Sequence, residues 1–110
     1  MTWFTNARDS ARVYLAMSTD AGVTFAPPTR IDDGNPVGRV DVELDEHGGA
    51  IVSWMEFRSD QQADVRVRRV DAQSTPGTAV IVARTSGARA SGFPRMVARG
   101  DDLLFAWTEA

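Results

Sequence analysis

The chain has 110 residues, of which 43% are hydrophobic and 25% charged, with a formal net charge of −3 and no cysteine. This composition is typical of one globular domain and excludes a disulfide framework and a thiolate metal site. A slightly acidic chain without a basic cluster argues against nucleic-acid binding, and no apolar run is long enough to span a membrane. Residues 1–5 lack the charged and apolar regions of a signal peptide, so we expect none in this chain.

Nine short strands and no helix are predicted along the chain. In chain order they cover residues 2–5, 12–17, 29–31, 38–44, 50–55, 65–68, 79–83, 93–98 and 103–107. Clusters of turn formers separate them, most densely at residues 32–36 and 45–49. No stretch of ten or more residues combines helical spacing with helix caps, so the pattern predicts an all-β chain.

Tryptophan recurs at a nearly constant spacing. Trp3, Trp54 and Trp107 lie 51 and 53 residues apart, and at the first of these offsets Asp20 falls on Asp71. A period near 50 residues with four short strands per unit is typical of a β-propeller blade. With strands labelled A to D from the centre outward, the chain reads B-C-D, A-B-C-D, A-B. The single domain, residues 1–110, is therefore predicted to divide into residues 1–36, 37–84 and 85–110.

Residues 18–25 predict a tight turn that is held by its own side chains. Asp20 is expected to accept hydrogen bonds from N–H groups two or three residues on, and Gly22 to take a positive φ. Phe25 is then expected to point back into a core. The alternative interpretation is an ordinary Asp-Gly hairpin turn.

This segment resembles the Asp-box, S/T-x-D-x-G-x-T-W/F, of sialidases (neuraminidases) and related β-propellers. All five fixed positions match, namely Ser18, Asp20, Gly22, Thr24 and Phe25. In that family the box lies at the outer rim of a blade, between the third and fourth strands and away from the active site. The resemblance implies a propeller of four-stranded antiparallel blades, about two of them in this chain, and a secreted or periplasmic parent protein.

Two blades would leave two apolar faces and several strand edges uncovered. We therefore expect a homo-oligomer, with a trimer that closes a six-bladed ring, the blade number of the sialidase family. The last A strand of one copy would complete the B-C-D unit of the next, which leaves one strand per copy surplus. Other ring sizes and a domain-swapped dimer are the alternatives.

Residues 38–44 alternate strictly between two kinds of side chain. Arg39, Asp41 and Glu43 are expected on one face of this strand. The apolar face is expected to carry Val40, Val42 and Leu44. If the strand is the innermost of its blade, its polar face approaches a central channel. The alternative interpretation is a solvated or ion-paired face without a ligand.

The resemblance also implies where catalytic groups would lie. Sialidases bind the substrate carboxylate with an arginine triad, and they use an Asp as acid/base and a Tyr–Glu pair as nucleophile. By position, only Arg39, Asp41 and Arg95 are candidates for such a site. Tyr14, the sole tyrosine, is expected in the outer half of a blade, where it would pack between blades.

No metal site and no cofactor are predicted. His47, the sole histidine, is expected to be a solvated turn residue, and one histidine without cysteine does not make a typical zinc site. Residues 32–35 offer oxygen ligands but lack the spacing of a calcium-binding EF-hand, so a turn is expected. The three tryptophans are expected in the core between blades, with stacking on sugar rings as the alternative.

Three functions are compatible with the sequence. The first is a sialidase-like propeller module that self-assembles and binds a glycan or another small anion near the channel. The second is part of an exo-sialidase, a glycoside hydrolase whose other catalytic residues lie on blades that this chain lacks. The third is a structural or protein-interaction module. As an isolated chain, the protein is expected not to be an enzyme.

Overall fold

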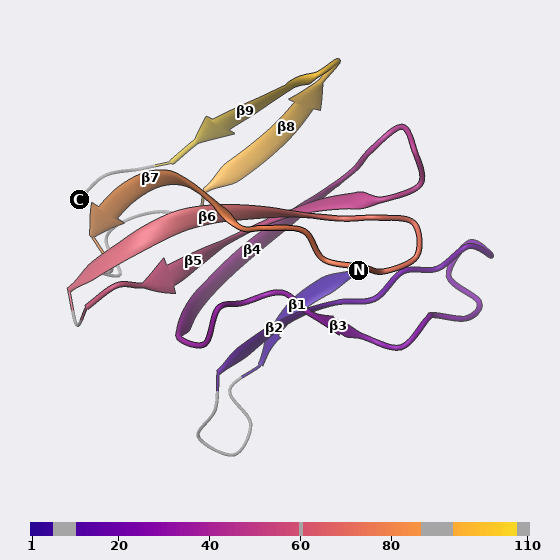
Figure 1. Ribbon diagram of the computed structural model, residues 1–110, viewed down its shortest axis with the longest axis horizontal. Coiled ribbons are helices and arrows are strands. Elements are labelled where there is room, and N and C mark those ends of the chain that lie inside the picture. The colour runs from indigo at the N-terminus through magenta and orange to yellow at the C-terminus, as the bar shows by residue number, and fades with distance from the viewer. Residues whose placement is uncertain (6–10, 60, 87–93, 108–110) are drawn as a thin grey trace.

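The computed structural model describes residues 1–5, 11–59, 61–86 and 94–107, and over these ranges it contains nine antiparallel strands and no helix (Figure 1). Sheet 1 has the order β1-β2-β3, sheet 2 the order β4-β5-β6-β7, and sheet 3 consists of β8 and β9. The strands are β1 (Thr2–Thr5), β2 (Arg12–Leu15), β3 (Thr29–Arg30), β4 (Pro36–Leu44), β5 (Ala50–Phe57), β6 (Gln62–Val70), β7 (Val80–Ser86), β8 (Arg95–Arg99) and β9 (Asp102–Ala106).

The predicted all-β fold is confirmed, and each predicted strand has a counterpart. The largest difference in length is at β6, which covers Gln62–Val70 where alternation predicted only residues 65–68. The reason is that β6 pairs with β5 along its whole length, which extends the strand beyond the segment that alternates. The strands group as three, four and two in chain order.

Sheet 2 lies between the other two sheets. One of its faces packs on sheet 1 through a core that includes Val13, Val52 and Trp54, all completely buried. The other face packs on sheet 3 through Met55 and Val65, with Phe105 of β9 against them. Successive residues of a strand point to opposite faces, so β5 contributes to both cores and is buried from residue 50 to residue 56.

The two faces predicted for residues 38–44 are confirmed, since Val40 and Val42 pack on the sheet 1 side while Arg39 and Asp41 contact groups on the sheet 3 side, but the strand is not regular. The register with β5 shifts between Gly38 and Asp41, and Arg39 lies in the left-handed region with φ 55°. Because of this β-bulge, regular pairing with β5 begins only at Asp41. Leu44 is 78% exposed instead of lying in the core, because it lies at the end of β4 next to the turn that leads into β5.

Gly38 lets β1 approach β4 closely. Its φ is 102°, and a Cβ placed on it would lie 3.0 Å from Cγ of Phe4. A larger residue at this position would therefore be strained and would displace the phenylalanine ring. This contact helps to hold sheet 1 against the beginning of sheet 2.

Candidate functional site

The three candidate residues of the predicted site do different things. Asp41 uses its carboxylate on the backbone: Oδ2 accepts from the N–H of Met96 and Oδ1 from the N–H of Val42, both at 2.9 Å. The first of these bonds ties β4 of sheet 2 to β8 of sheet 3. Asp41 therefore has a structural task at the junction of the two sheets.

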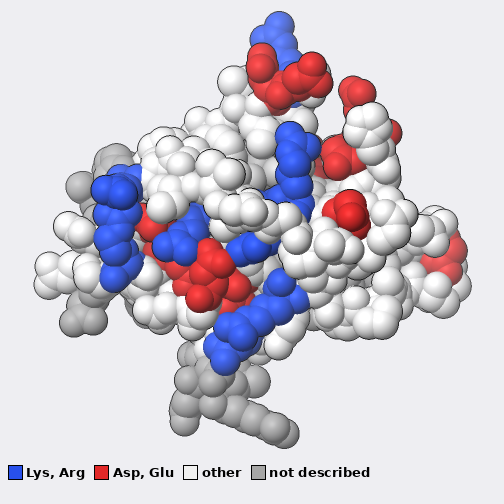
Figure 2. All heavy atoms as spheres, in the orientation of Figure 1, with Lys and Arg blue, Asp and Glu red and all other residues white. Residues whose placement is uncertain are grey.

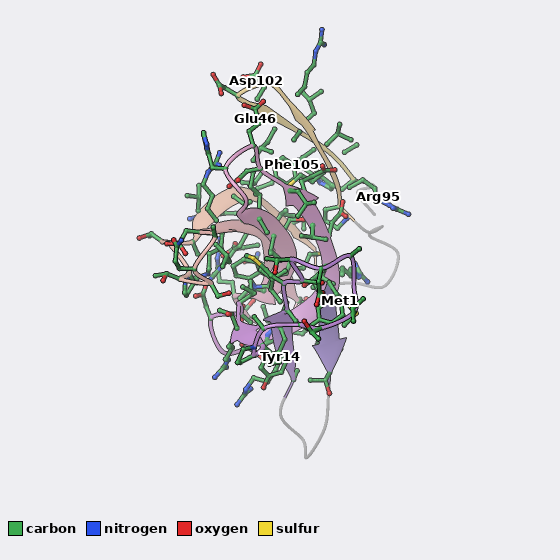
Figure 3. The ribbon with its side chains drawn as sticks, turned by 90° about the vertical axis from the view of Figure 1, so that its right-hand side faces the viewer. Met1, Tyr14, Glu46, Arg95, Asp102 and Phe105 are labelled. Carbon is green, nitrogen blue, oxygen red and sulfur yellow. The ribbon has the colours of Figure 1, made fainter. Side chains whose placement is uncertain are left out.

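Arg39 and Arg95 point to different surroundings. One guanidinium nitrogen of Arg39 donates to Sδ of Met55 at 3.7 Å, on the side of sheet 2 that faces sheet 3. Arg95 precedes Met96 on β8 and is exposed on the opposite face of sheet 3, where it points away from the molecule (Figure 3). The guanidinium groups of Arg39 and Arg95 thus do not converge on Asp41 to form one binding site in this chain.

Tyr14 lies half-buried on β2, between the buried residues Val13 and Leu15. Those two face sheet 2, so Tyr14 lies on the other face of sheet 1 (Figure 3). The proposed packing between blades stays a prediction.

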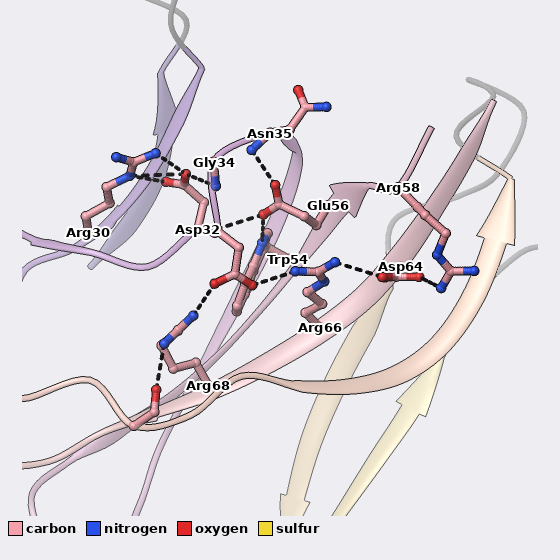
Figure 4. A network of polar contacts seen from close by, with 12 residues as sticks. Arg30, Asp32, Gly34, Asn35, Trp54, Glu56, Arg58, Asp64, Arg66 and Arg68 are labelled. Atoms are coloured by element: carbon pink, nitrogen blue, oxygen red, sulfur yellow. Dashed lines mark hydrogen bonds and ion pairs between the residues drawn. The ribbon is translucent and has the colours of Figure 1, made fainter. Parts of the chain in front are cut away.

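A network of charged residues that the sequence pattern did not reveal lies at the boundary of sheets 1 and 2 (Figure 4). We call it the polar network; it comprises Arg30, Asp32, Asp33, Glu56, Arg58, Asp64, Arg66 and Arg68. Four guanidinium groups face four carboxylates, so the network is neutral overall. Figure 2 shows Arg and acidic side chains side by side on this surface.

Asp32 anchors the loop that leads from β3 into β4. Its carboxylate accepts from the N–H groups of Val13 at 2.7 Å and Gly34 at 3.0 Å, and forms an ion pair with Arg30 at 2.8 Å. Burial alone would raise the pKa of Asp32, but the hydrogen bonds from Arg30 and Val13 outweigh it and lower the pKa below its ordinary value. Asp32 is therefore held as a carboxylate.

Glu56, at the end of β5, holds the same loop from the other side. Its Oε1 accepts from Nε1 of Trp54 at 2.8 Å and from the N–H of Asp33 at 3.0 Å, and its Oε2 accepts from the N–H of Asn35. Both oxygens of a nearly fully buried carboxylate are thus satisfied. Glu56 connects the tryptophan core to the loop between the sheets.

Arg66 joins two carboxylates across the network. It forms ion pairs with Asp33 at 2.6 Å and with the buried Asp64 at 2.9 Å, and Asp64 is also paired with Arg58. Burial would lower the pKa of Arg66, but the two carboxylates outweigh it and raise the pKa. Arg68 adds a second ion pair to Asp33 at 2.5 Å.

Arg68 also extends the network toward the loop between β6 and β7. It donates to the carbonyl oxygen of Gly77 at 2.6 Å and covers the ring of Trp54 at 5.6 Å from the centroid, a cation–π contact. Beside it lies an open groove of about 600 Å³, lined by Asp33, Arg66, Arg68 and residues 76–79 and 81. The terminal nitrogens of both arginines are engaged, so the network is built to hold the two sheets together.

The turn of residues 18–25 forms the predicted self-bonded structure. The carboxylate of Asp20 accepts from the N–H of Thr24 at 2.9 Å and from its hydroxyl, and Ser18 Oγ accepts from the N–H of Gly22 at 2.8 Å. The bonds from the hydroxyl and the N–H of Thr24, and a further bond from the hydroxyl of Ser18, lower the pKa of Asp20 to about 2. Gly22 has the expected positive φ, whereas the carboxylate bonds the residue four positions on instead of two or three.

The expectation that Phe25 packs into a core is wrong. Its side chain is 45% exposed, because the turn projects beyond β2 and β3 (Figure 1). The equivalent position in the repeat keeps the main contact: Asp71 accepts from the N–H of Thr75, four residues on, at 2.9 Å. Asp20 and Asp71 therefore make the same bond 51 residues apart. Asp20 lies between β2 and β3, and Asp71 lies between β6 and β7, which are the corresponding strands of sheet 2 in the repeat.

A second groove, of about 390 Å³, lies between the turn of residues 45–49 and that of residues 100–101. Glu46 of the first turn and Asp102 at the start of β9 project at the same end of the molecule (Figure 3). His47 lies here as an exposed turn residue whose N–H donates to Asp45 at 2.8 Å. Among the residues that the structure describes, no group of three or more His, Asp or Glu side chains is arranged to hold a metal ion.

Comparison with protein-family models, curated proteins and solved structures finds no match for this chain. In the described ranges, no helix is long and apolar enough to cross a membrane. The function is therefore inferred from the geometry of the sheets, the turns and the polar network.

Proposed function

We propose that this chain is a module of a sialidase-like Asp-box β-propeller, about two blades in size, whose first task is assembly. The observation that carries the proposal is the equivalence of Asp20 and Asp71, which make the same hydrogen bond 51 residues apart. It is supported by the stacking of three sheets in chain order, with the four-stranded sheet in the middle. Asp45, in the turn between β4 and β5, accepts the same bond from Gly49, so the support comes from the matching positions of Asp20 and Asp71 in the repeat and not from the bond alone.

The partner in this proposal is a second copy of the chain, and a trimer that closes a six-bladed ring is the favoured assembly. It would cover the open face of sheet 1 and that of sheet 3, where Val97 and Leu104 are exposed. Light scattering on the purified chain tests the assembly. A mass of a single chain over a range of concentrations would overturn it.

The ligand in this proposal is a glycan or another small anion near the channel of the assembled ring, bound by the exposed Arg95 and not by Arg39 and Arg95 of one copy together. A glycan array, followed by titration with the glycans retained, tests this part. Arg95→Ala should weaken the binding, while Arg99→Ala, at the other end of β8, should leave it unchanged. Equal binding by both variants would place the ligand elsewhere.

Catalysis is not part of the proposal. Both carboxylate oxygens of Asp41 accept backbone N–H groups, and Tyr14 lies on another sheet and away from Asp41. We therefore expect no turnover of a fluorogenic sialoside by the chain. Turnover that purifies with the chain and is lost in Asp41→Ala would favour an exo-sialidase instead.

A further inference from the structure

In the part of the chain that the structure describes, sheets 1 and 3 lie on opposite faces of sheet 2. Sheet 2 separates them, because one core joins it to sheet 1 and another core joins it to sheet 3. Any contact between a surface of sheet 3 and a surface on the sheet 1 side of the molecule is therefore a contact between two copies. Such a contact joins two different surfaces, so it leads to a ring or a chain of copies.

Sheet 3 presents an apolar surface on its outer face. Val97 of β8 and Leu104 of β9 are direct partners in the register, and they are 56% and 54% exposed. The neighbouring pair, Met96 and Phe105, points the other way and packs on sheet 2. In the part of the chain that the structure describes, no strand pairs with β9 on the side away from β8.

A second apolar surface lies on the sheet 1 side of β4. Leu44 pairs with Ala50 on this side, lies at the strand end where it also lines the groove toward sheet 3, and is 78% exposed. Val40 and Val42 are half-buried beside it. Sheet 1 covers the beginning of β4, where Phe4 contacts Gly38, and leaves the end of the strand open.

The repeat relates these two surfaces to two residues that already lie along one groove between the sheets of a single chain. Ile51 of sheet 2 and Ala98 of sheet 3 line the same groove between their sheets. Leu104 takes the place of Ile51 one repeat later, at the 53-residue offset of the tryptophans. Leu44 takes the place of Ala98 one repeat earlier, at the 54-residue offset between Gly38 and Gly92.

If sheet 3 of one copy is followed by a second copy in the way that sheet 2 is followed by sheet 3, the two exposed leucines lie together. We propose that the outer face of sheet 3 binds the sheet 1 side of β4 in a second copy of this chain, with Leu104 of one copy against Leu44 of the other. This inference rests on the proposed assembly and specifies its interface. Both side chains are more than half exposed within their own copy, and they become buried only in the contact.

Cysteine cross-linking tests this interface directly, because the chain contains no cysteine. Leu44→Cys and Leu104→Cys are prepared as separate variants, one of them carrying a size tag, and are mixed under mild oxidation. The expected result is a disulfide-linked product that contains one copy of each variant. The matched control pairs Leu104→Cys with Val23→Cys, an even more exposed position in the turn of residues 18–25, and should give no such product.

Two results would overturn the proposal in different ways. If the wild-type chain has the mass of an oligomer but the leucine pair does not cross-link above the control, the interface is wrong and the assembly stands. If the wild-type mass is that of one chain, both are wrong, and the apolar surfaces serve another partner. Leu104→Arg provides a second readout, since it should reduce the mass to a single chain while the far-ultraviolet circular dichroism stays unchanged.

Discussion

Strands β5 and β9 occupy the same place in the repeat but have different surroundings. In β5 every residue from 50 to 56 is buried, whereas in β9 exposed and half-buried residues alternate. Ile51 is 3% exposed and its counterpart Leu104 is 54% exposed. Both strands are rich in apolar residues, so what differs is the neighbouring sheet: β5 has one on each face and β9 on a single face.

The two boundaries of sheet 2 also differ in chemistry. Between sheets 1 and 2, the inner part is apolar and the outer part is held by the polar network around Arg66 and Asp33. Between sheets 2 and 3, Asp41 accepts one hydrogen bond from the N–H of Met96, and the remainder of the boundary is largely apolar. Adjacent sheets in this molecule are thus joined by different combinations of burial and ion pairing.

The largest effect on folding is expected at the centre of sheet 2, which is covered by a sheet on each face. Trp54→Ala should cost about 3–5 kcal/mol of unfolding free energy, because it leaves a cavity under Arg68 and removes the donor to Glu56. Urea unfolding at a fixed chain concentration measures this cost. A loss below about 1 kcal/mol, the range of surface substitutions, would mean that the tryptophan core does not hold sheets 1 and 2 together.

The next effect concerns the polar boundary. Asp64→Asn should cost about 2–3 kcal/mol, because it removes the carboxylate charge shared by Arg66 and Arg58 at a buried position. Asp102→Asn, an exposed position in β9, is the matched control and should stay within about 0.5 kcal/mol. Equal effects of the two variants in urea unfolding would contradict a structural role of the network.

A pH-dependent effect is expected at the turn of residues 18–25. The pKa of Asp20 is lowered from 3.8 to about 2, so its ionised form stabilises the fold above its ordinary pKa and this contribution is lost as the pH falls through about 2. Asp20→Asn should therefore unfold at a lower temperature than the wild type at pH 7, and the difference should shrink as the pH approaches 2. Thermal unfolding at several pH values measures it.

Thr24→Val is the control for the cause of this shift. It removes the hydroxyl that donates to Asp20 but keeps the backbone N–H, so the pKa of Asp20 should rise part of the way toward 3.8. Carboxyl-carbon NMR titration follows it. A wild-type pKa near 3.8 would show that the turn bonds are weaker in solution.

The smallest effect on folding is expected on the outer face of sheet 3. Leu104→Ser should change the unfolding free energy of a single copy by no more than about 0.5 kcal/mol, because the side chain is already more than half exposed. The same variant should weaken the assembly. A large loss of stability at a concentration where the chain is monomeric would mean that Leu104 packs within its own copy.

Local patterns were enough to predict the strands and the turn. Alternation and turn formers depend on neighbouring residues, and the bond of Asp20 to Thr24 spans four positions. The polar network was missed because the contacts that connect its parts span 21 to 35 residues, as between Glu56 and Asn35 or Arg68 and Asp33, although its other ion pairs span two to six. Only the stacking of sheets 1 and 2 brings these groups together.

One signal for the network was present in the sequence. Asp64, Arg66 and Arg68 alternate along one strand, which puts three charges on one face, and Glu56 follows Trp54 by two positions, which puts both on one face of β5. Gly38, which precedes Arg39, was a weaker signal for the bulge. The positions of Phe25 and Leu44 depended on whether a neighbouring sheet covers them, and alternation carries no information on that.

The mass of the wild-type chain in solution, measured by light scattering during size-exclusion chromatography, tests the proposed assembly most directly. A mass near three times 12.0 kDa is the predicted result, and it would mean that the open faces of sheets 1 and 3 are covered by other copies. A mass of 12.0 kDa at every concentration would contradict it. The exposed Val97, Leu104 and Leu44 would then have to be explained without a second copy of this chain.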